Sequence, residues 1–230
     1  MAPAIDSYRA PAWLPGGHAQ TIWPLLCKGP SPRLQRERWR TPDGDFIDLD
    51  WLAHSPGAPL VVLFHGLEGS SNSPYARSLM RHLAAIGWNG VVPHFRGCSG
   101  EPNRRPRAYH AGDAEEIEWI LARIAALHPG APRFAAGVSL GGNALLVWLG
   151  TRGPAARRHI DAAAAVCAPL DLAAMGHHLT QGFNQLYTRH FLTTLKRSAI
   201  AKLRAHPGLF DAAAVLRARN LHEFDNLVTA

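Results

Sequence analysis

The chain has 230 residues, and 47% of them are hydrophobic, which is enough to bury one core and too apolar for a disordered chain. The formal charge is +7, yet the basic residues are scattered, and the tightest group, 104–107, lies in a predicted loop. We therefore expect no nucleic-acid partner, because such binding needs a clustered patch or a known motif. The three cysteines are widely spaced, which fits neither a disulfide framework nor a zinc pattern, so no metal is expected.

The first 20 residues contain no basic stretch followed by an apolar one, so they do not resemble a signal peptide. No apolar run of the sequence approaches the ~20 residues that a membrane-spanning helix needs. The sequence therefore predicts a reduced, cytoplasmic protein with no membrane span.

The N-terminal part, residues 1–35, is rich in proline, glycine and aromatic residues and is predicted to form an irregular arm on the domain. The alternating stretches RERWR and FIDLDWL flank a turn at Asp43-Gly44, which predicts an antiparallel pair of strands. Four continuous apolar stretches follow. They are PLVVLFHG, WNGVVPHF, PRFAAGV and IDAAAAVCAPL, and each is typical of a strand buried on both faces of a parallel sheet.

Helical patterns lie between these strands. SPYARSLMRHLAAIG ends at Gly87, and DAEEIEWILARIAALHPG begins with the acidic residues that a helix N-terminus favours. Alternating strands and helices predict an α/β fold, with a mostly parallel sheet and helices on both faces, over residues 36–170. Residues 171–230 are predicted to form several helices, which we interpret as a cap within the same single domain.

The stretch AAGVSLGGNALL places Ser139 at the junction of a predicted strand and a predicted helix. Gly137 and Gly141 stand two residues before and after it, as in a nucleophile elbow, where larger side chains would collide with neighbouring backbone. The alternative is that Ser139 only caps the helix, since serine is a favoured N-cap. Capping does not need the glycines, and glycine inside a helix costs about 1 kcal/mol relative to alanine, so we favour a nucleophile.

A second motif, FHGLEGSSNSPY, follows the first of the buried strands. In α/β-hydrolases one oxyanion donor comes from the loop after an early strand, and the other is the N–H of the residue after the nucleophile. The backbone N–H groups of Leu67 and Leu140 fit these two positions. His65 and Gly66 complete the loop, and for His65 we favour a supporting hydrogen bond over direct proton transfer.

Six segments occur in a characteristic order: PDGDFIDLDW, FHGLEGSSNSPYA, HFRGCSGEPNR, YHAGDAEEI, GVSLGGNAL and HEFDNLVTA. Together they resemble the YheT-like esterases, a subfamily of the α/β-hydrolase superfamily. The resemblance implies an α/β-hydrolase fold and a serine hydrolase of short- to medium-chain carboxylic esters. It implies Ser139 as the nucleophile and His65, Gly66 and Leu67 as the oxyanion loop, with no cofactor.

The resemblance also implies an acid and a base that would follow the last residues of this sequence, after two more strands. We therefore expect the sheet to lack its last strands and turnover by this chain to be low. Asp171 is a candidate replacement acid, although capping of the following helix is the favoured role. Five downstream histidines are candidate bases, for which surface or core roles are favoured: His177, His178, His190, His206 and His222.

Two functions stay open on the sequence alone. The first is a serine esterase that forms an acyl-enzyme on Ser139 with a small-molecule acyl ester. The alternative is a catalytically defective remnant or a non-catalytic protein that binds a ligand in the same pocket. In either case the last strand would be an exposed sheet edge, which predicts marginal stability, a homo-oligomer that covers the edge, or a frameshifted or cut gene.

Overall fold

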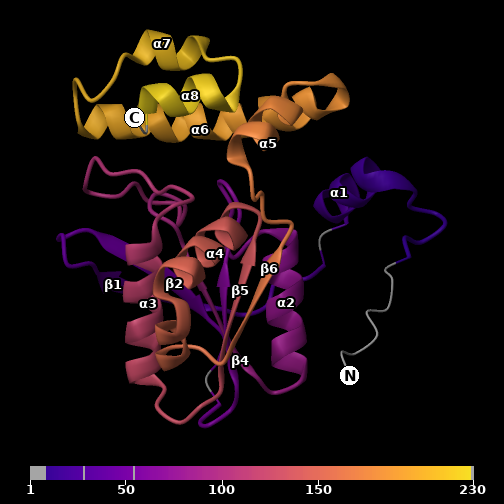
Figure 1. Cartoon of the computed structure of the whole chain (residues 1–230), viewed down its shortest axis with the longest axis vertical. Helices are drawn as coiled ribbons and strands as arrows, with labels where there is room; N and C mark the ends of the chain where they lie inside the picture. Colours follow the sequence, from indigo (N-terminus) through magenta and orange to yellow (C-terminus); the bar gives the residue numbers. More distant parts are fainter. Residues whose placement is uncertain (1–8, 28, 54, 229–230) are drawn as a thin grey trace.

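The computed structural model describes residues 9–27, 29–53 and 55–228, which form a sheet of six strands with helices around it (Figure 1). The strand order is β1-β2-β4-β3-β5-β6. β1 and β2 pair antiparallel, β2 pairs antiparallel with β4, and the remaining neighbours are parallel. The strands are β1 (Gln35–Arg40), β2 (Phe46–Trp51), β3 (Leu60–Phe64), β4 (Asn89–Pro93), β5 (Arg133–Val138) and β6 (Ala162–Val166). The predicted α/β fold is confirmed, and so is the antiparallel pair around Asp43-Gly44.

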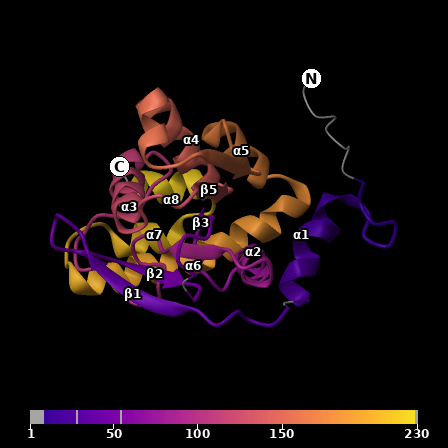
Figure 2. The same ribbon diagram turned by 90° about the horizontal axis from the view of Figure 1, so that it is seen from below.

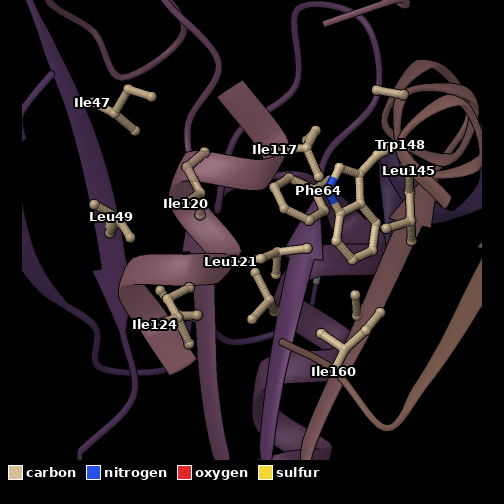
Figure 3. Close-up of a cluster of buried hydrophobic side chains, with 14 of the residues drawn as sticks. Ile47, Leu49, Phe64, Ile117, Ile120, Leu121, Ile124, Leu145, Trp148 and Ile160 are labelled. Carbon is tan, nitrogen blue, oxygen red and sulfur yellow. The ribbon is translucent and has the colours of Figure 1, made fainter. Parts of the chain in front are cut away.

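Three helices cover the two faces of the sheet. α3 (Ala114–Leu127) and α4 (Leu140–Arg152) pack on one face, and α2 (Pro74–Ala85) packs on the other (Figure 1). Side chains of β3 alternate between the faces: Leu60, Val62 and Phe64 join the first core, and Val61 and Leu63 join the second. Figure 3 shows the first core, in which residues of α3 and α4 meet over the sheet.

Strand β6 forms one edge of the sheet and pairs only with β5 in the described part of the chain. All five of its residues are exposed, so burial on both faces, which the apolar run by itself predicts, is wrong, and the exposed sheet edge expected for the last strand is confirmed. The strand is apolar as predicted, but an apolar strand is buried only where other elements pack against it. Too few of the described residues pack against β6 to bury it. Pairing of this edge with a second copy stays a prediction.

The helices after β6 form a separate layer above the carboxyl ends of the strands (Figure 1). They are α5 (Leu172–Leu179), α6 (Gln185–Ala205), α7 (Ala212–Arg217) and α8 (Leu221–Val228), with a short 3-10 turn η2 (Gly182–Asn184). This layer, which we call the cap, has a hydrophobic cluster of its own, built on Leu192, Leu195, Val215, Leu221 and Phe224. None of the helices in the described ranges is long and apolar enough to cross a membrane.

The N-terminal arm contains a helix, α1 (Gly16–Leu26), where an irregular segment was predicted. Two glycines open it and Pro24 lies inside it, which weakens the helical signal in the sequence. None of its residues is buried. Figure 2 shows α1 beside α2 at the side of the domain, so the helix lies on the surface.

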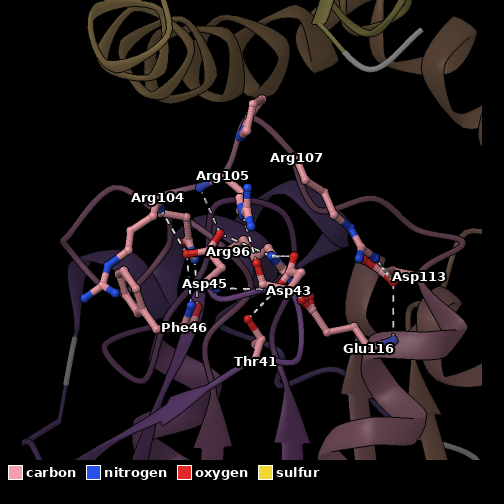
Figure 4. A network of polar contacts seen from close by, with 12 residues as sticks. Thr41, Asp43, Asp45, Phe46, Arg96, Arg104, Arg105, Arg107, Asp113 and Glu116 are labelled. Carbon is pink, nitrogen blue, oxygen red and sulfur yellow. Dashed lines mark hydrogen bonds and ion pairs between the residues drawn. The ribbon is translucent and has the colours of Figure 1, made fainter.

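A buried ionic cluster joins the loop after β4 to the rest of the domain (Figure 4). The guanidinium of Arg96 contacts three carboxylates: Nε lies 2.8 Å from Glu116 Oε1, and Nη1 lies 2.7 Å from Asp43 Oδ2 and 3.1 Å from Asp45 Oδ2. Asp45 also accepts a hydrogen bond of 2.9 Å from Asn103 Nδ2. The cluster therefore fixes the hairpin turn, α3 and the loop that runs over the carboxyl ends of the strands.

Candidate active site

Ser139 lies in a sharp turn between β5 and α4. Its backbone has φ 53° and ψ −119°, a left-handed conformation that a residue with a side chain rarely adopts. Its N–H donates to the Val166 carbonyl at 2.9 Å, and its carbonyl accepts from the Asn143 N–H at 2.9 Å. The side chain caps no backbone N–H of α4, so the capping alternative finds no support. The turn therefore holds Ser139 in a strained conformation, and the Ser139 hydroxyl takes no part in capping α4.

The glycines around Ser139 allow three backbone segments to come together. A Cβ added to Gly137 would lie 2.5 Å from the carbonyl oxygen of Gly141. A Cβ added to Gly141 would collide with the carbonyl oxygens of Phe64 and His65 at the end of β3. The turn at Ser139 and the loop after β3 are therefore packed backbone against backbone, and only glycine fits at these positions.

His65 supports this loop from inside the domain. Its Nδ1 lies 2.8 Å from the Gly66 carbonyl oxygen, and its Nε2 accepts the Phe95 N–H at 3.1 Å. Nδ1 therefore carries the proton of a neutral imidazole. Complete burial lowers the pKa of His65 to about 3, against the opposing effect of the Gly66 hydrogen bond. These contacts agree with the supporting role expected for His65.

Two tyrosines hold the same loop, and neither contact follows from a sequence pattern. Tyr75 Oη accepts the Gly66 N–H at 2.8 Å, and Tyr109 Oη accepts the Glu68 N–H at 2.8 Å. Glu68 has φ 52°, so the loop is strained next to Leu67 as well. The Glu68 carboxylate accepts a hydrogen bond of 2.9 Å from Ser198 Oγ on α6, which ties the loop to the cap.

The N–H groups of Leu67 and Leu140 have no hydrogen-bond acceptor within the described ranges. The side chain of Leu67 packs against the hydrophobic cluster of the cap. Both leucines and Ser139 line a cavity of about 490 Å³ between the domain core, the cap and α1. A larger cavity of about 1320 Å³ adjoins it, also lined by both leucines but not by Ser139. We take the smaller cavity as the candidate site, because it contains the hydroxyl.

The candidate replacement acid, Asp171, and the five candidate histidine bases make no hydrogen bond with Ser139 in the described part of the chain. Asp171 Oδ1 accepts the Ala174 N–H at 2.8 Å and caps α5, which supports the capping role. None of the downstream histidines lines the smaller cavity, and in the described part of the chain no side chain makes a hydrogen bond with Ser139 Oγ. No group of three His, Cys, Asp or Glu side chains in those residues is placed to hold a metal ion.

Comparison with known protein families shows to which family this chain belongs. The model of the α/β-hydrolase fold matches residues 59–222, which include the turn at Ser139 and most of the cap. The chain is an α/β hydrolase. It shares 44% identity over 221 residues with YheT of Escherichia coli (strain K12), an esterase by name, covering 93% of this chain and 64% of YheT.

Two further proteins are similar to this chain. Phospholipase ABHD3 of Mus musculus is 31% identical over 238 residues, covering 98% of this chain and 57% of ABHD3. The esterase Pf2001 of Pyrococcus furiosus superposes with a TM-score of 0.53 at 18% identity, covering 75% of this chain and 66% of Pf2001, which shows a shared fold. The chain thus spans 64% and 57% of the two curated relatives.

The buried His65 predicts an early loss of stability in acid. A group whose folded pKa lies below its unfolded value of about 6.5 contributes stability that is lost as the pH falls from that value toward the folded pKa near 3. We expect the free energy of unfolding to fall by ~1 kcal/mol per pH unit below pH 6. Urea unfolding at pH 7, 6, 5 and 4.5 measures this.

The matched variant is His65→Gln, which places a hydrogen-bonding amide at the site but does not titrate there. Its unfolding free energy should change less over the same pH range, and the difference between the two proteins isolates His65 from the carboxylates. Parallel pH curves for the two proteins would contradict the prediction.

Proposed function

We propose that the whole protein hydrolyses carboxylic esters through an acyl-enzyme on Ser139. Ser139 Oγ attacks the acyl carbonyl carbon, and the N–H groups of Leu67 and Leu140 stabilise the oxyanion that forms. The ester C–O bond then breaks, the alcohol leaves with the proton taken from Ser139, and water releases the acid. The observation that carries the proposal is the strained turn at Ser139, whose residue lines an apolar cavity together with Leu67 and Leu140, two residues with unpaired N–H groups in the described ranges.

No base is assigned to the Ser139 proton, since none of the described side chains hydrogen-bonds the hydroxyl. The substrates proposed are short- to medium-chain acyl esters. The names of two relatives support an ester substrate: YheT is named an esterase, and ABHD3 is named a phospholipase.

A fluorescent fluorophosphonate tests the proposal, because it labels only an activated serine. In the whole protein we expect a label on Ser139, and Ser139→Ala should lower both the labelling and the ester hydrolysis by at least ~10³-fold. Ser31→Ala is the matched control, since Ser31 is exposed and lines neither cavity, so the variant should keep the label.

A protein that binds an alkyl ester but takes no label would contradict the esterase. That result would favour the alternative function, a non-catalytic ligand-binding protein with the same pocket.

A further inference from the structure

The smaller cavity has three walls, and one of them is the N-terminal helix. The core contributes Leu67, Ser139, Leu140 and Pro169, while α1 contributes Gly17, His18 and Thr21. The cap contributes Leu172, Met175, Leu179, Asn184, Tyr187, Phe191 and Leu221. Figures 1 and 2 show α1 on the side of the domain where the cap begins.

Nearly every group in the cavity wall is apolar or already paired. Thr21 Oγ1 donates to the Gly17 carbonyl at 2.8 Å, so its hydroxyl is satisfied within α1. Tyr187 Oη lies 2.9 Å from His18 Nδ1, which pairs the tyrosine hydroxyl with one of the two ring nitrogens of His18. Asn184 Nδ2 donates to the His178 carbonyl at 3.3 Å, and the hydroxyl of Ser139 is the reactive group of the wall. Such a wall suits a hydrocarbon chain and offers no charged partner to a ligand.

His18 of α1 contacts two residues of the cap. Its ring lies 4.6 Å from that of Phe183 and 5.7 Å from that of Tyr187, in addition to the hydrogen bond to the Tyr187 hydroxyl. No residue of α1 is buried, and apart from the cap the helix packs against α2. The contacts of His18 with Tyr187 and Phe183 join this wall to the cap and so help to set the width of the cavity.

We infer that α1 forms a wall of the acyl-chain subsite next to Ser139, and that the contact between His18 and Tyr187 limits the length of acyl chain that fits. The inference rests on the proposed function and names the part of the substrate that this cavity takes. His18 and Tyr187 are then specificity-determining residues, with no part in the bond-breaking steps. The alcohol part of the ester extends into the larger cavity, which shares Leu67 and Leu140 with the smaller one.

Binding of ethyl octanoate and ethyl hexadecanoate tests the inference without requiring turnover. Each ester displaces dansyl-undecanoate from the protein, and the ratio of the two dissociation constants is compared between variants. We expect His18→Ala and Tyr187→Ala to shift this ratio about tenfold toward the longer ester. Tyr187→Phe, which keeps the ring and loses only the hydrogen bond, should shift it less. Thr21→Leu, which adds volume inside the cavity, should shift it toward the shorter ester.

The matched control is His178→Ala, an exposed histidine of the cap that does not line the cavity. It should leave the ratio unchanged. An unchanged ratio in both His18→Ala and Tyr187→Ala would overturn the inference.

Hydrogen exchange gives a second readout that needs no variant. Ethyl octanoate should slow exchange of the backbone amides of α1, and an unaffected α1 would also overturn the inference. Failure of the proposed function looks different: Ser139 would take no phosphonate label while both esters still bind with the expected dependence on His18 and Tyr187.

Discussion

Replacing Arg96 with methionine should lower the free energy of unfolding by about 3–5 kcal/mol. The guanidinium side chain is only 3% exposed, and it is the cation shared by Asp43, Asp45 and Glu116. Methionine has a similar length and stays apolar, so the change removes the charge with little loss of packing. Asp45 and Glu116, which are 0% and 3% exposed, would then be buried carboxylates without their cation.

The stability loss of the Arg96 variant should depend on pH, because Glu116 can take up a proton. Burial already raises the pKa of Glu116, against the attraction of Arg96. Without Arg96 this pKa should rise further, so the variant should lose less stability at pH 5 than at pH 7. Urea unfolding at both pH values measures the effect.

Arg152→Met is the control for the Arg96 variant, because Arg152 pairs with Glu115, which is 80% exposed, and with the partly exposed Glu118. Such a surface pair contributes about 0–1 kcal/mol. An equal effect of the two substitutions would show that the buried cluster contributes no more than an ordinary surface pair.

The strands were predictable because their signal is local. The run 60–64 is continuously apolar and ends at a glycine-containing loop, so its sequence alone defines a buried strand. The turn at Ser139 was predictable for a related reason, since Gly137 and Gly141 stand at positions where any larger side chain would collide with backbone.

Features that depend on distant partners could not be predicted in the same way. The partners of Arg96 lie 20 residues away at Glu116 and 53 residues away at Asp43, and no spacing rule joins them. Strand β6 has the same apolar character as β3, yet its exposure depends on what lies next to it. α1 was missed because its formation depends on contacts such as His18–Tyr187 and little on its own sequence.

Replacing Gly141 with alanine should destabilise the protein by about 1–3 kcal/mol or more, because the new methyl group meets the carbonyl oxygens of Phe64 and His65. Both oxygens belong to backbone at the end of β3 and cannot rotate away as a side chain could. The clash pushes the turn at Ser139 away from the loop that carries Leu67, so labelling of Ser139 by a fluorophosphonate should slow as well.

Gly150→Ala tests the same substitution in the same helix without the clash. A Cβ at Gly150 has no atom within 4 Å, and the position is exposed. Alanine there should stabilise α4 by up to about 1 kcal/mol and raise the melting temperature by roughly 2–4 °C. The two substitutions should therefore have opposite signs in thermal unfolding, and only Gly141→Ala should affect Ser139. If both variants raised the melting temperature, the close backbone contact between the elbow and β3 would be wrong, and with it the geometry that holds Ser139 beside the Leu67 N–H.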